Sequence, residues 1–274
     1  MSRFVFHITV ASTLFLVVLH SPTLANERIF SYTYQTNVLA KGQREIEIWN
    51  TFHWQREDFF RKLVHRIEYE IGIGGNIQTA FYLNLVNEAA FVPGTSPSIE
   101  KKIEAGFSNE WKFKFSDPLA DAIGFAGYLE LGILADELEL EGKLIFDKQV
   151  GNTTHALNIV GEPEWETEVE GNGTSTAFEF SLEVDYGFSY RLNDNWNLGI
   201  EAVNRNVFVK GTGLEHSTLF AGPVVAYRSA GWWATLTVLP QVYAFKVQPG
   251  NSRKHLELLS RERLETRLLF SYEL

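Results

Sequence analysis

Charged residues recur at every second position in several stretches of this chain. Glu45 and Glu47 are separated by one residue, and so are Glu68 and Glu70. Residues two apart in an extended strand face the same side, so these carboxylates are expected to gather on one face. Carboxylates beside cations on neighbouring strands can form ion pairs across a sheet. Around an enclosed lumen, they can instead line a path that selects solutes by charge.

The same alternation selects a larger set of charged residues predicted to face inward. They are Glu45, Glu47, Lys62, Arg66, Glu68, Glu70, Lys112, Lys114, Glu130, Glu179, Glu183, Asp185, Arg263 and Arg267. One interpretation is an interior packed with ion pairs, which would brace the wall and block flow. The other is a narrow, charge-lined channel. The mixture of both signs favours mutual pairing, and the sequence leaves both interpretations open.

The histidines form no catalytic group with their sequence neighbours. His216 and Ser217 are adjacent, so a strand would place them on opposite faces and prevent a nucleophile–base pair. His53 and His65 are also predicted on opposite faces. The chain contains no G-x-S-x-G, H-E-x-x-H or phosphate-loop pattern, and its acidic stretches match no calcium-loop spacing. The sequence therefore predicts no catalytic residue, no metal site and no cofactor.

The stretch Phe178–Tyr190 shows which element must position the charges. Its even positions are all aromatic or aliphatic, whereas its odd positions are acidic or small. The stretch is longer than the ~5–6 residues of an ordinary strand, and long enough for the ~9–11 residues of a strand that crosses an outer membrane. Length and alternation together predict a wall with a lipid-facing side and a polar interior.

Similar alternation recurs along the chain and predicts about twelve strands, with no convincing amphipathic helix. The predicted strands are Arg44–Trp54, Arg61–Ile73, Ile77–Leu85, Ile99–Phe115, Ile123–Ile133, Leu138–Lys148, His155–Trp165, Phe178–Tyr190, Trp196–Ala202, Ser217–Tyr227, Trp232–Ala244 and Glu262–Leu274. We expect an all-β fold, a transmembrane antiparallel up-and-down β-barrel of about 12 strands. A soluble β-protein is the alternative.

Connections between the predicted strands are of two kinds. Short turns rich in Gly, Asn, Asp or Pro alternate with joins that are generally longer or more polar. The second kind comprises Gln55–Asp58, Asn87–Pro97, Leu134–Glu137, Gly161–Ser175, Arg205–Gly213 and Lys246–Lys254. This alternation is typical of an even-stranded barrel with both termini at the short-turn, periplasmic end.

Aromatic residues on the predicted outer face gather near the short turns. They are Phe113, Phe188, Tyr190, Trp196, Tyr227, Trp232, Phe270 and Tyr272. A ring of aromatics is expected at a bilayer boundary, although aromatics also accumulate in soluble cores. Two outward cations, Arg61 and Lys101, fall at the other ends of their strands. They are candidates for contact with lipopolysaccharide phosphates, or they simply lie in solvent.

The N-terminus has the layout of a secretory signal peptide. Arg3 precedes an apolar run, and Thr23-Leu24-Ala25 forms a small-residue exit, so cleavage is expected after Ala25. A retained membrane anchor is the alternative. The predicted organisation is a signal peptide at 1–25, a periplasmic or plug-like segment at 26–42, and a barrel at 43–274. The formal charge of −10 becomes −11 without Arg3, which argues against nucleic acid as a partner.

The C-terminal sequence LETRLLFSYEL resembles the terminal strand of outer-membrane β-barrels, although it ends in Leu274 where an aromatic is usual. In that class, the terminal strand is recognised by the barrel-assembly machinery. The segments FSYTYQTNVLAKGQREIEIW (Phe30–Trp49) and HRIEYEIGIGGNIQTAFYLN (His65–Asn84) resemble an uncharacterised family of Gram-negative outer-membrane barrels. The whole chain is loosely similar to porin-like barrels found beside aromatic-degradation pathways, which are proposed to admit hydrophobic compounds.

These resemblances imply a location in the bacterial outer membrane. They also imply contacts with outer-membrane lipid, lipopolysaccharide, the assembly machinery and small solutes. Porin-like passive transport is the expected function. A structural or surface-interaction barrel with a closed lumen is the alternative, and an outer-membrane hydrolase is disfavoured because no catalytic constellation is visible.

Overall fold

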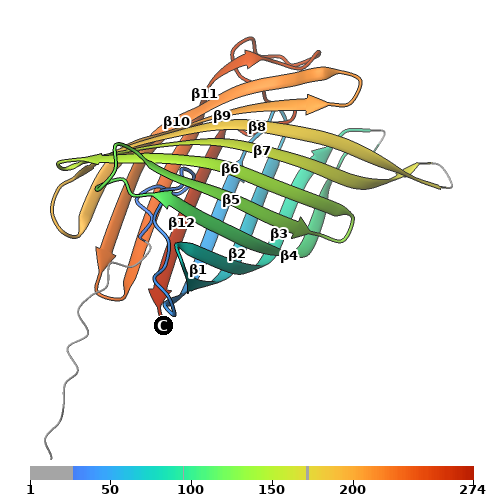
Figure 1. Cartoon of the computed structure of the whole chain (residues 1–274). Helices are drawn as coiled ribbons and strands as arrows, with labels where there is room; N and C mark the ends of the chain where they lie inside the picture. Colours follow the sequence, from blue (N-terminus) through green and yellow to red (C-terminus); the bar gives the residue numbers. More distant parts are fainter. Residues whose placement is uncertain (1–26, 95, 171–172) are drawn as a thin grey trace, which may run out of the picture.

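The alternating segments form one closed antiparallel barrel in the computed structural model, which describes residues 27–94, 96–170 and 173–274. Each strand pairs with its neighbours in the chain, and β1 also pairs with β12 (Figure 1). The strands are β1 (Arg44–Trp54), β2 (Phe60–Gly74), β3 (Ile77–Val92), β4 (Ser98–Ser116), β5 (Gly124–Ile133), β6 (Glu137–Val150), β7 (Thr153–Glu170), β8 (Gly173–Arg191), β9 (Trp196–Val209), β10 (Gly213–Ser229), β11 (Trp232–Lys246) and β12 (Leu264–Glu273). The predicted barrel is confirmed. The predicted signal peptide lies outside the described residues.

The wall separates an apolar outside from a polar inside. Ile103 and Leu83 are 70% and 63% exposed, whereas Glu47 and Glu68 are fully buried. A water-soluble protein of this size rarely exposes a continuous apolar surface of this kind, whereas a barrel in lipid requires one. Closure of β1 on β12 leaves no open sheet edge and excludes a two-sheet sandwich.

Several strands extend beyond their predicted ends. β7 continues to Glu170 and β8 begins at Gly173, so most of the predicted join Gly161–Ser175 is paired backbone. β4 and β8 are each 19 residues long, well above the ~9–11 needed to cross a membrane. Figure 1 shows the β7–β8 hairpin projecting past the rest of the barrel. Polar and apolar residues alternate less regularly in these extensions. Beyond the apolar layer that surrounds the barrel, both faces of a strand can contact water.

The last join is longer than predicted. It runs through residues 247–263, and β12 begins at Leu264 instead of Glu262. Leu258 is buried, and its carbonyl accepts a hydrogen bond from Glu57 N at 2.7 Å. This join therefore folds back against the β1–β2 join instead of extending into solvent.

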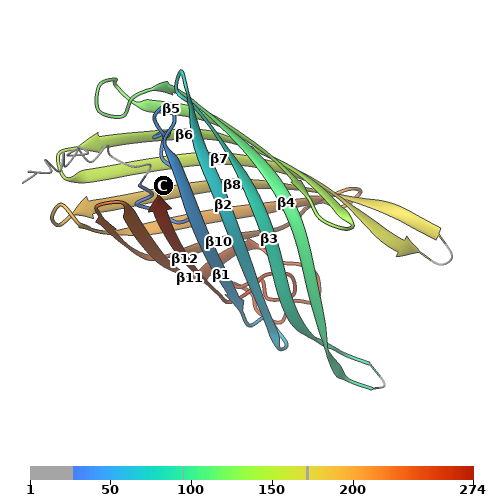
Figure 2. The same cartoon turned by 90° about the horizontal axis from the view of Figure 1, so that it is seen from below.

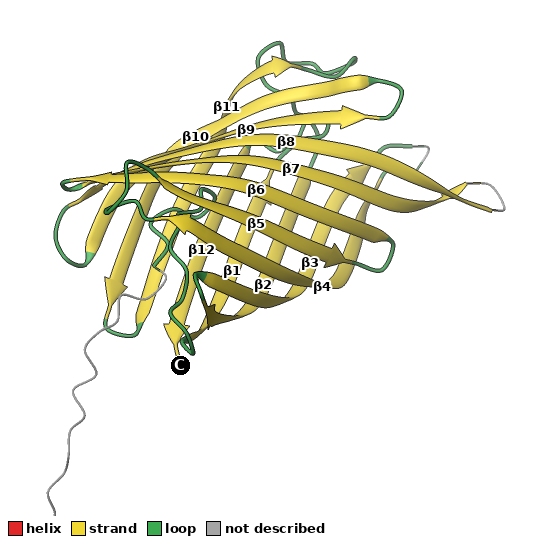
Figure 3. Ribbon diagram, in the orientation of Figure 1, coloured by secondary structure: helices red, strands yellow, loops and turns green. Residues whose placement is uncertain are grey.

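The N-terminal segment, residues 27–43, forms no strand; residues 27–39 lie inside the barrel, and residues 40–42 are exposed at its rim (Figure 2, Figure 3). Phe30, Tyr32 and Tyr34 are all at most 6% exposed. The last strand ends beside the start of the first, where Leu274 N donates to Arg44 O at 3.0 Å. Among the described residues, no helix is long and apolar enough to cross a membrane.

Candidate functional site

The N-terminal segment is held in the lumen chiefly by Glu201 of β9. The amides of Ser31, Tyr32 and Thr33 donate to its carboxylate at 3.1, 2.9 and 2.8 Å. Thr237 Oγ1 on β11 donates to the same carboxylate at 2.6 Å. Consecutive amides converging on one buried carboxylate form charge-assisted hydrogen bonds, which are stronger than neutral ones. One side chain thus fixes the backbone of the segment to the wall.

Three further polar side chains of the wall hold the rest of this segment. Asn158 on β7 accepts from Tyr34 N at 2.6 Å and donates to Tyr34 O at 3.0 Å. Thr36 Oγ1 donates to Asp147 of β6 at 2.7 Å. Leu39 N donates to Gln78 Oε1 of β3 at 2.9 Å. These bonds supply the partners that a buried, irregular backbone needs.

Two tyrosines of the segment lie beneath lumen cations. The Arg267 guanidinium is 3.8 Å from the ring centre of Tyr32, and Lys143 Nζ is 4.2 Å from that of Tyr34. Arg28, from the segment itself, stacks on the Tyr34 ring at 3.9 Å. Burial raises the pKa of both tyrosine hydroxyls well above the ordinary value, so the rings stay neutral. Cation–π attraction therefore adds to the hydrogen bonds that hold the segment.

A cavity of about 320 Å³ lies between this segment and the long-join end of the barrel. Tyr32 and Tyr34 form part of its lining, and at the other end it reaches Leu134 in the β5–β6 join. Its wall carries charges of both signs. The charged lining residues are Lys62, Arg66, Lys143, Arg205, Arg267, Glu104, Glu137, Glu139, Glu141, Glu162, Glu183 and Asp185.

Ion pairs fix several of these charges. Arg205 on β9 binds Glu183 of β8 at 2.8 Å and also contacts Glu265 of β12, across the lumen. Arg66 reaches Glu130 from β2 to β5 at 2.5 Å. Such pairs narrow the lumen and give it a fixed pattern of charge. Paired charges therefore form part of the wall of the cavity.

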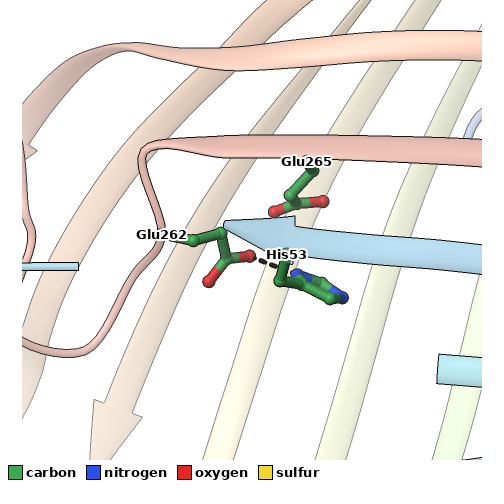
Figure 4. A group of neighbouring side chains, drawn as sticks. All are labelled: His53, Glu262 and Glu265. Carbon is green, nitrogen blue, oxygen red and sulfur yellow. Dashed lines mark hydrogen bonds and ion pairs between the residues drawn. The ribbon is translucent and has the colours of Figure 1, made fainter. Parts of the chain in front are cut away.

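A second cluster lies where β12 joins the preceding loop. His53 of β1 bonds Glu262 at 2.6 Å, and Glu265 lies beside them (Figure 4). Burial alone would raise the pKa of the Glu262 carboxyl, but the charge and hydrogen bond of His53 hold it well below its ordinary value. His53 and Arg205 already engage these carboxylates. The cluster thus clamps the β1–β12 seam at the long-join end.

The predicted lumen charges fall into three groups. Buried residues are Glu45, Glu47, Glu68, Glu70, Lys112, Glu130 and Asp185. Partly buried residues are Lys62, Arg66, Lys114, Glu179, Glu183 and Arg267. Arg263 is exposed and precedes β12. Lys114 is directed to the β4–β5 turn, where it pairs with Asp117 at 2.6 Å. The predicted charges that line the cavity are Lys62, Arg66, Glu183, Asp185 and Arg267.

The outward candidates occupy the rims of the barrel. Arg61 and Lys101 are exposed, and the register sets both opposite Ala89 in one row across β2, β3 and β4. At the short-turn end, aromatic contacts run from strand to strand across β9 to β12. They join Trp196 to Tyr227 at 4.7 Å, Tyr227 to Trp232 at 5.0 Å, and Trp232 to Phe270 at 5.8 Å.

The other predicted aromatics lie on the same outer surface. Tyr190 and Tyr272 are exposed, and Phe113 and Phe188 are partly buried. Phe188 lies 5.1 Å from the His155 ring.

The described histidines have structural partners. His216 lies opposite buried Val207 and accepts from Arg261 Nε at 2.9 Å, whereas Ser217 bonds Asn206 at 2.6 Å. These two side chains therefore point to opposite sides of β10.

Two lumen residues of β9, Glu201 and Arg205, are not among the residues predicted from the sequence to face inward. The sequence predicts that the strand from Trp196 ends at Ala202, which places Arg205 in a join, whereas β9 continues to Val209. Glu201 was inside the predicted strand, and alternation with Ile200 was the signal that could have placed it inward.

A model described as a family of unknown function, DUF6662, matches residues 22–274. No curated protein matches the chain. Among solved structures, the COG4313 outer membrane channel from Pseudomonas putida F1 is similar at 9% identity and a TM-score of 0.58, over 90% of this chain and all of that one. The translocator domain of autotransporter NalP from Neisseria meningitidis is similar at 13% identity and a TM-score of 0.55, over 86% and 90%. At these identities the likeness is one of fold.

Proposed function

The chain belongs to DUF6662, a family of unknown function, and we propose from its geometry that it admits small polar or charged solutes across the bacterial outer membrane. The observation that supports this proposal is a charged cavity that ends at the N-terminal segment, which is held by non-covalent contacts. Of this segment, Gly42 and Gln43 bond to the strand backbone at Gly72, and the residues before them form no ladder. Displacing this segment would extend the cavity toward the short-turn end without breaking a β-ladder. Residues 27–43 would act as a plug.

The proposed orientation in the outer membrane is inferred from the side chains on the outer surface of the barrel. Its apolar band would face lipid, and the aromatic row of β9 to β12 would mark the periplasmic boundary. Arg61 and Lys101 would meet lipopolysaccharide phosphates at the other rim. Phe270, Tyr272 and Leu274, on the outer side of the last strand, would be recognised by the assembly machinery, as the resemblance to terminal barrel strands suggests.

The lining predicts a weak preference for cations. Seven acidic side chains and five Lys or Arg side chains line the cavity. Rings of carboxylates favour cations in channels, and nearby cations reduce this preference. A charged wall also disfavours apolar solutes. The proposed solutes therefore differ from the hydrophobic compounds that the loose resemblance to other barrels implies.

Planar-bilayer recording tests the proposal. The protein without its predicted signal peptide should show little current, whereas a variant that also lacks residues 26–40 should conduct steadily and prefer K⁺ to Cl⁻ in a salt gradient. The shortened variant keeps Gln43 and all twelve strands, so heat-dependent gel mobility checks that its barrel is intact. A folded but silent shortened variant would contradict the proposal. It would favour a structural or surface barrel whose ion pairs close the lumen.

A further inference from the structure

Five glutamates gather on the inner face of the first four strands, outside the cavity described above. Glu45, Glu47, Glu68, Glu70 and Glu110 are each at most 4% exposed. The strand register sets Glu45 directly opposite Glu70 and Glu47 directly opposite Glu68. Like charges directly opposite each other destabilise a sheet, and the burial of a charge without a counter-charge is costly. Two such pairs side by side therefore favour the binding of compensating positive charge.

Four of the five glutamates lack a direct ion pair with a described lysine or arginine. Within the described parts of the chain, Glu45, Glu47, Glu68 and Glu110 form no ion pair with lysine or arginine. Two buried cations, Arg28 and Lys112, lie near the group and offset part of its charge. Arg28 also donates to Ser31 O at 3.1 Å and stacks on the rings of Tyr34 and Trp49. Five carboxylates beside two cations still leave an excess of negative charge.

In three of these glutamates, one carboxylate oxygen accepts a hydrogen bond from an aromatic side chain. Trp233 Nε1 donates to Glu45 at 2.7 Å, Trp49 Nε1 donates to Glu47 at 2.8 Å, and the Tyr82 hydroxyl donates to Glu110. The second oxygen of each of these three glutamates is buried and accepts no hydrogen bond from any described residue. Glu68 is 0% exposed, and neither of its carboxylate oxygens accepts a hydrogen bond from a donor in the described part of the chain. Donors that fix one oxygen while the other stays available are the usual support of metal-ligating carboxylates.

We propose that this carboxylate group binds a divalent cation, with Ca²⁺ as the best fit. Oxygens of Glu68, Glu70 and Glu110 lie within 4.8 Å of one another, and so do oxygens of Glu45, Glu47 and Glu70. Ca²⁺ binds oxygens at about 2.3–2.6 Å, so two ligands on opposite sides of one ion lie about 5 Å apart. An all-oxygen donor set suits Ca²⁺ or Mg²⁺ over zinc or copper. Mg²⁺ usually keeps several of its waters, which disfavours it in a group buried this deeply.

Held by Glu68, Glu70 and Glu110, the bound ion would join β2 and β4 beneath the N-terminal segment. It would offset part of the charge of the facing pairs and so stabilise the barrel. Sequence patterns for calcium loops could not reveal this group, because its ligands come from separate strands that only the barrel register brings together.

The test compares refolding with and without the ion. The chain lacking its predicted signal peptide is unfolded in urea with a chelator and refolded in detergent with CaCl₂, MgCl₂ or chelator. After dialysis, calcium content is measured by atomic emission and the unfolding temperature by circular dichroism. We expect retained Ca²⁺, a higher unfolding temperature with CaCl₂ and a smaller rise with MgCl₂.

Two variants separate binding from general stability. Glu68→Gln should lower the affinity for Ca²⁺ at least ~10-fold and abolish the rise with CaCl₂, yet unfold at a higher temperature than the unmodified protein in chelator because one repulsive charge is gone. Glu104→Gln is the control. It removes a lumen carboxylate that lies outside the group and pairs with Lys102 at 2.6 Å, so this variant should still bind Ca²⁺. Equal calcium in the unmodified protein and Glu68→Gln, or none in the unmodified protein, would overturn the proposal. Both measurements are made in detergent, so the conductance result does not affect them.

Discussion

Glu201 shows how much of the lumen architecture depends on one residue. Its carboxylate accepts hydrogen bonds from three consecutive amides of the N-terminal segment and from Thr237. Its replacement by an apolar side chain leaves all these buried donors without an acceptor. Each buried donor left without an acceptor destabilises the folded state by about 1–3 kcal/mol. The loss of Glu201 should therefore weaken the binding of the segment more than the loss of any single aromatic contact.

Glu201→Ala is therefore expected to release the N-terminal segment while the barrel stays folded. Trypsin should then cleave after Arg28, which is 6% exposed in the intact protein. Glu201→Gln keeps one acceptor oxygen and should be cleaved at an intermediate rate, and Glu104→Gln should be cleaved no faster than the unmodified protein. Mass spectrometry of timed digests measures the order. Equal protection of Arg28 in all four proteins would show that Glu201 does not hold the segment.

Asp117, in the β4–β5 turn, gives a pH-dependent prediction. The hydrogen bond from Lys114 lowers the pKa of Asp117 from its ordinary 3.8 to about 2, with help from the amide of Leu119. A depressed pKa stabilises the folded state above the unfolded value, and this stabilisation is lost as the pH falls from about 4 toward about 2. In Lys114→Met the pKa should rise toward 3.8, measured by NMR titration of the carboxyl. An unchanged pKa would assign the shift to the turn amides.

Individual lumen residues could be predicted only where alternation was strong. Glu45, Glu47, Glu68 and Glu70 alternate with apolar residues such as Ile46 and Tyr69, and their burial follows from strand periodicity. Arg263 lies in the same pattern but is exposed, because the chain leaves the barrel before β12. Periodicity gives the face of a residue within a strand and says nothing about where pairing ends.

At the scale of elements, the N-terminal segment needs glycines in the wall it packs against. A Cβ atom on Gly187 of β8 would lie 2.8 Å from the ring of Phe30. A Cβ on Gly72 of β2 would lie 2.1 Å from Ala40 O. Both distances are too short for real contacts, so these glycines provide the room in which the segment lies.

Gly187→Ala should displace Phe30 and loosen the N-terminal segment at a cost of about 1–3 kcal/mol, the usual range for overpacking. Gly161→Ala on β7 is the matched control, because its Cβ would meet the Phe180 ring at an ordinary 3.5 Å. Cleavage after Arg28 by trypsin should accelerate in Gly187→Ala alone. Equal acceleration in both variants would indicate a general effect of strand substitution.

The strands were predictable as elements, whereas the position of the N-terminal segment was not. Strand existence follows from alternating polarity, which the lipid and the lumen impose on opposite faces. The segment has no period, because its amides bond to side chains on β3, β7 and β9. Those contacts exist only after distant strands close into a barrel. The sequence thus allows a plug in this segment, but no residue pattern predicts it.

For the whole molecule, closure between β1 and β12 is the step that removes both open edges. The register pairs Ile46 with Tyr272 and Trp54 with Leu264 along the full seam. The His53–Glu262 bond closes its long-join end, and the bond from Leu274 N to Arg44 O closes the other. An unpaired edge in lipid leaves backbone groups without partners at several kcal/mol each, so no partly closed form is expected to be stable.

Deletion of residues 264–274 should therefore abolish the folded barrel, whereas deletion of residues 26–40 should not. The first removes β12 and exposes the edges of β1 and β11, and the second removes only part of a segment that belongs to no sheet. After refolding in detergent, unheated samples of the intact protein and the N-terminal deletion should migrate faster on gels than heated ones, and the β12 deletion should not. Retained heat-dependent mobility without β12 would show that eleven strands suffice for closure, and the β1–β12 seam would then be dispensable.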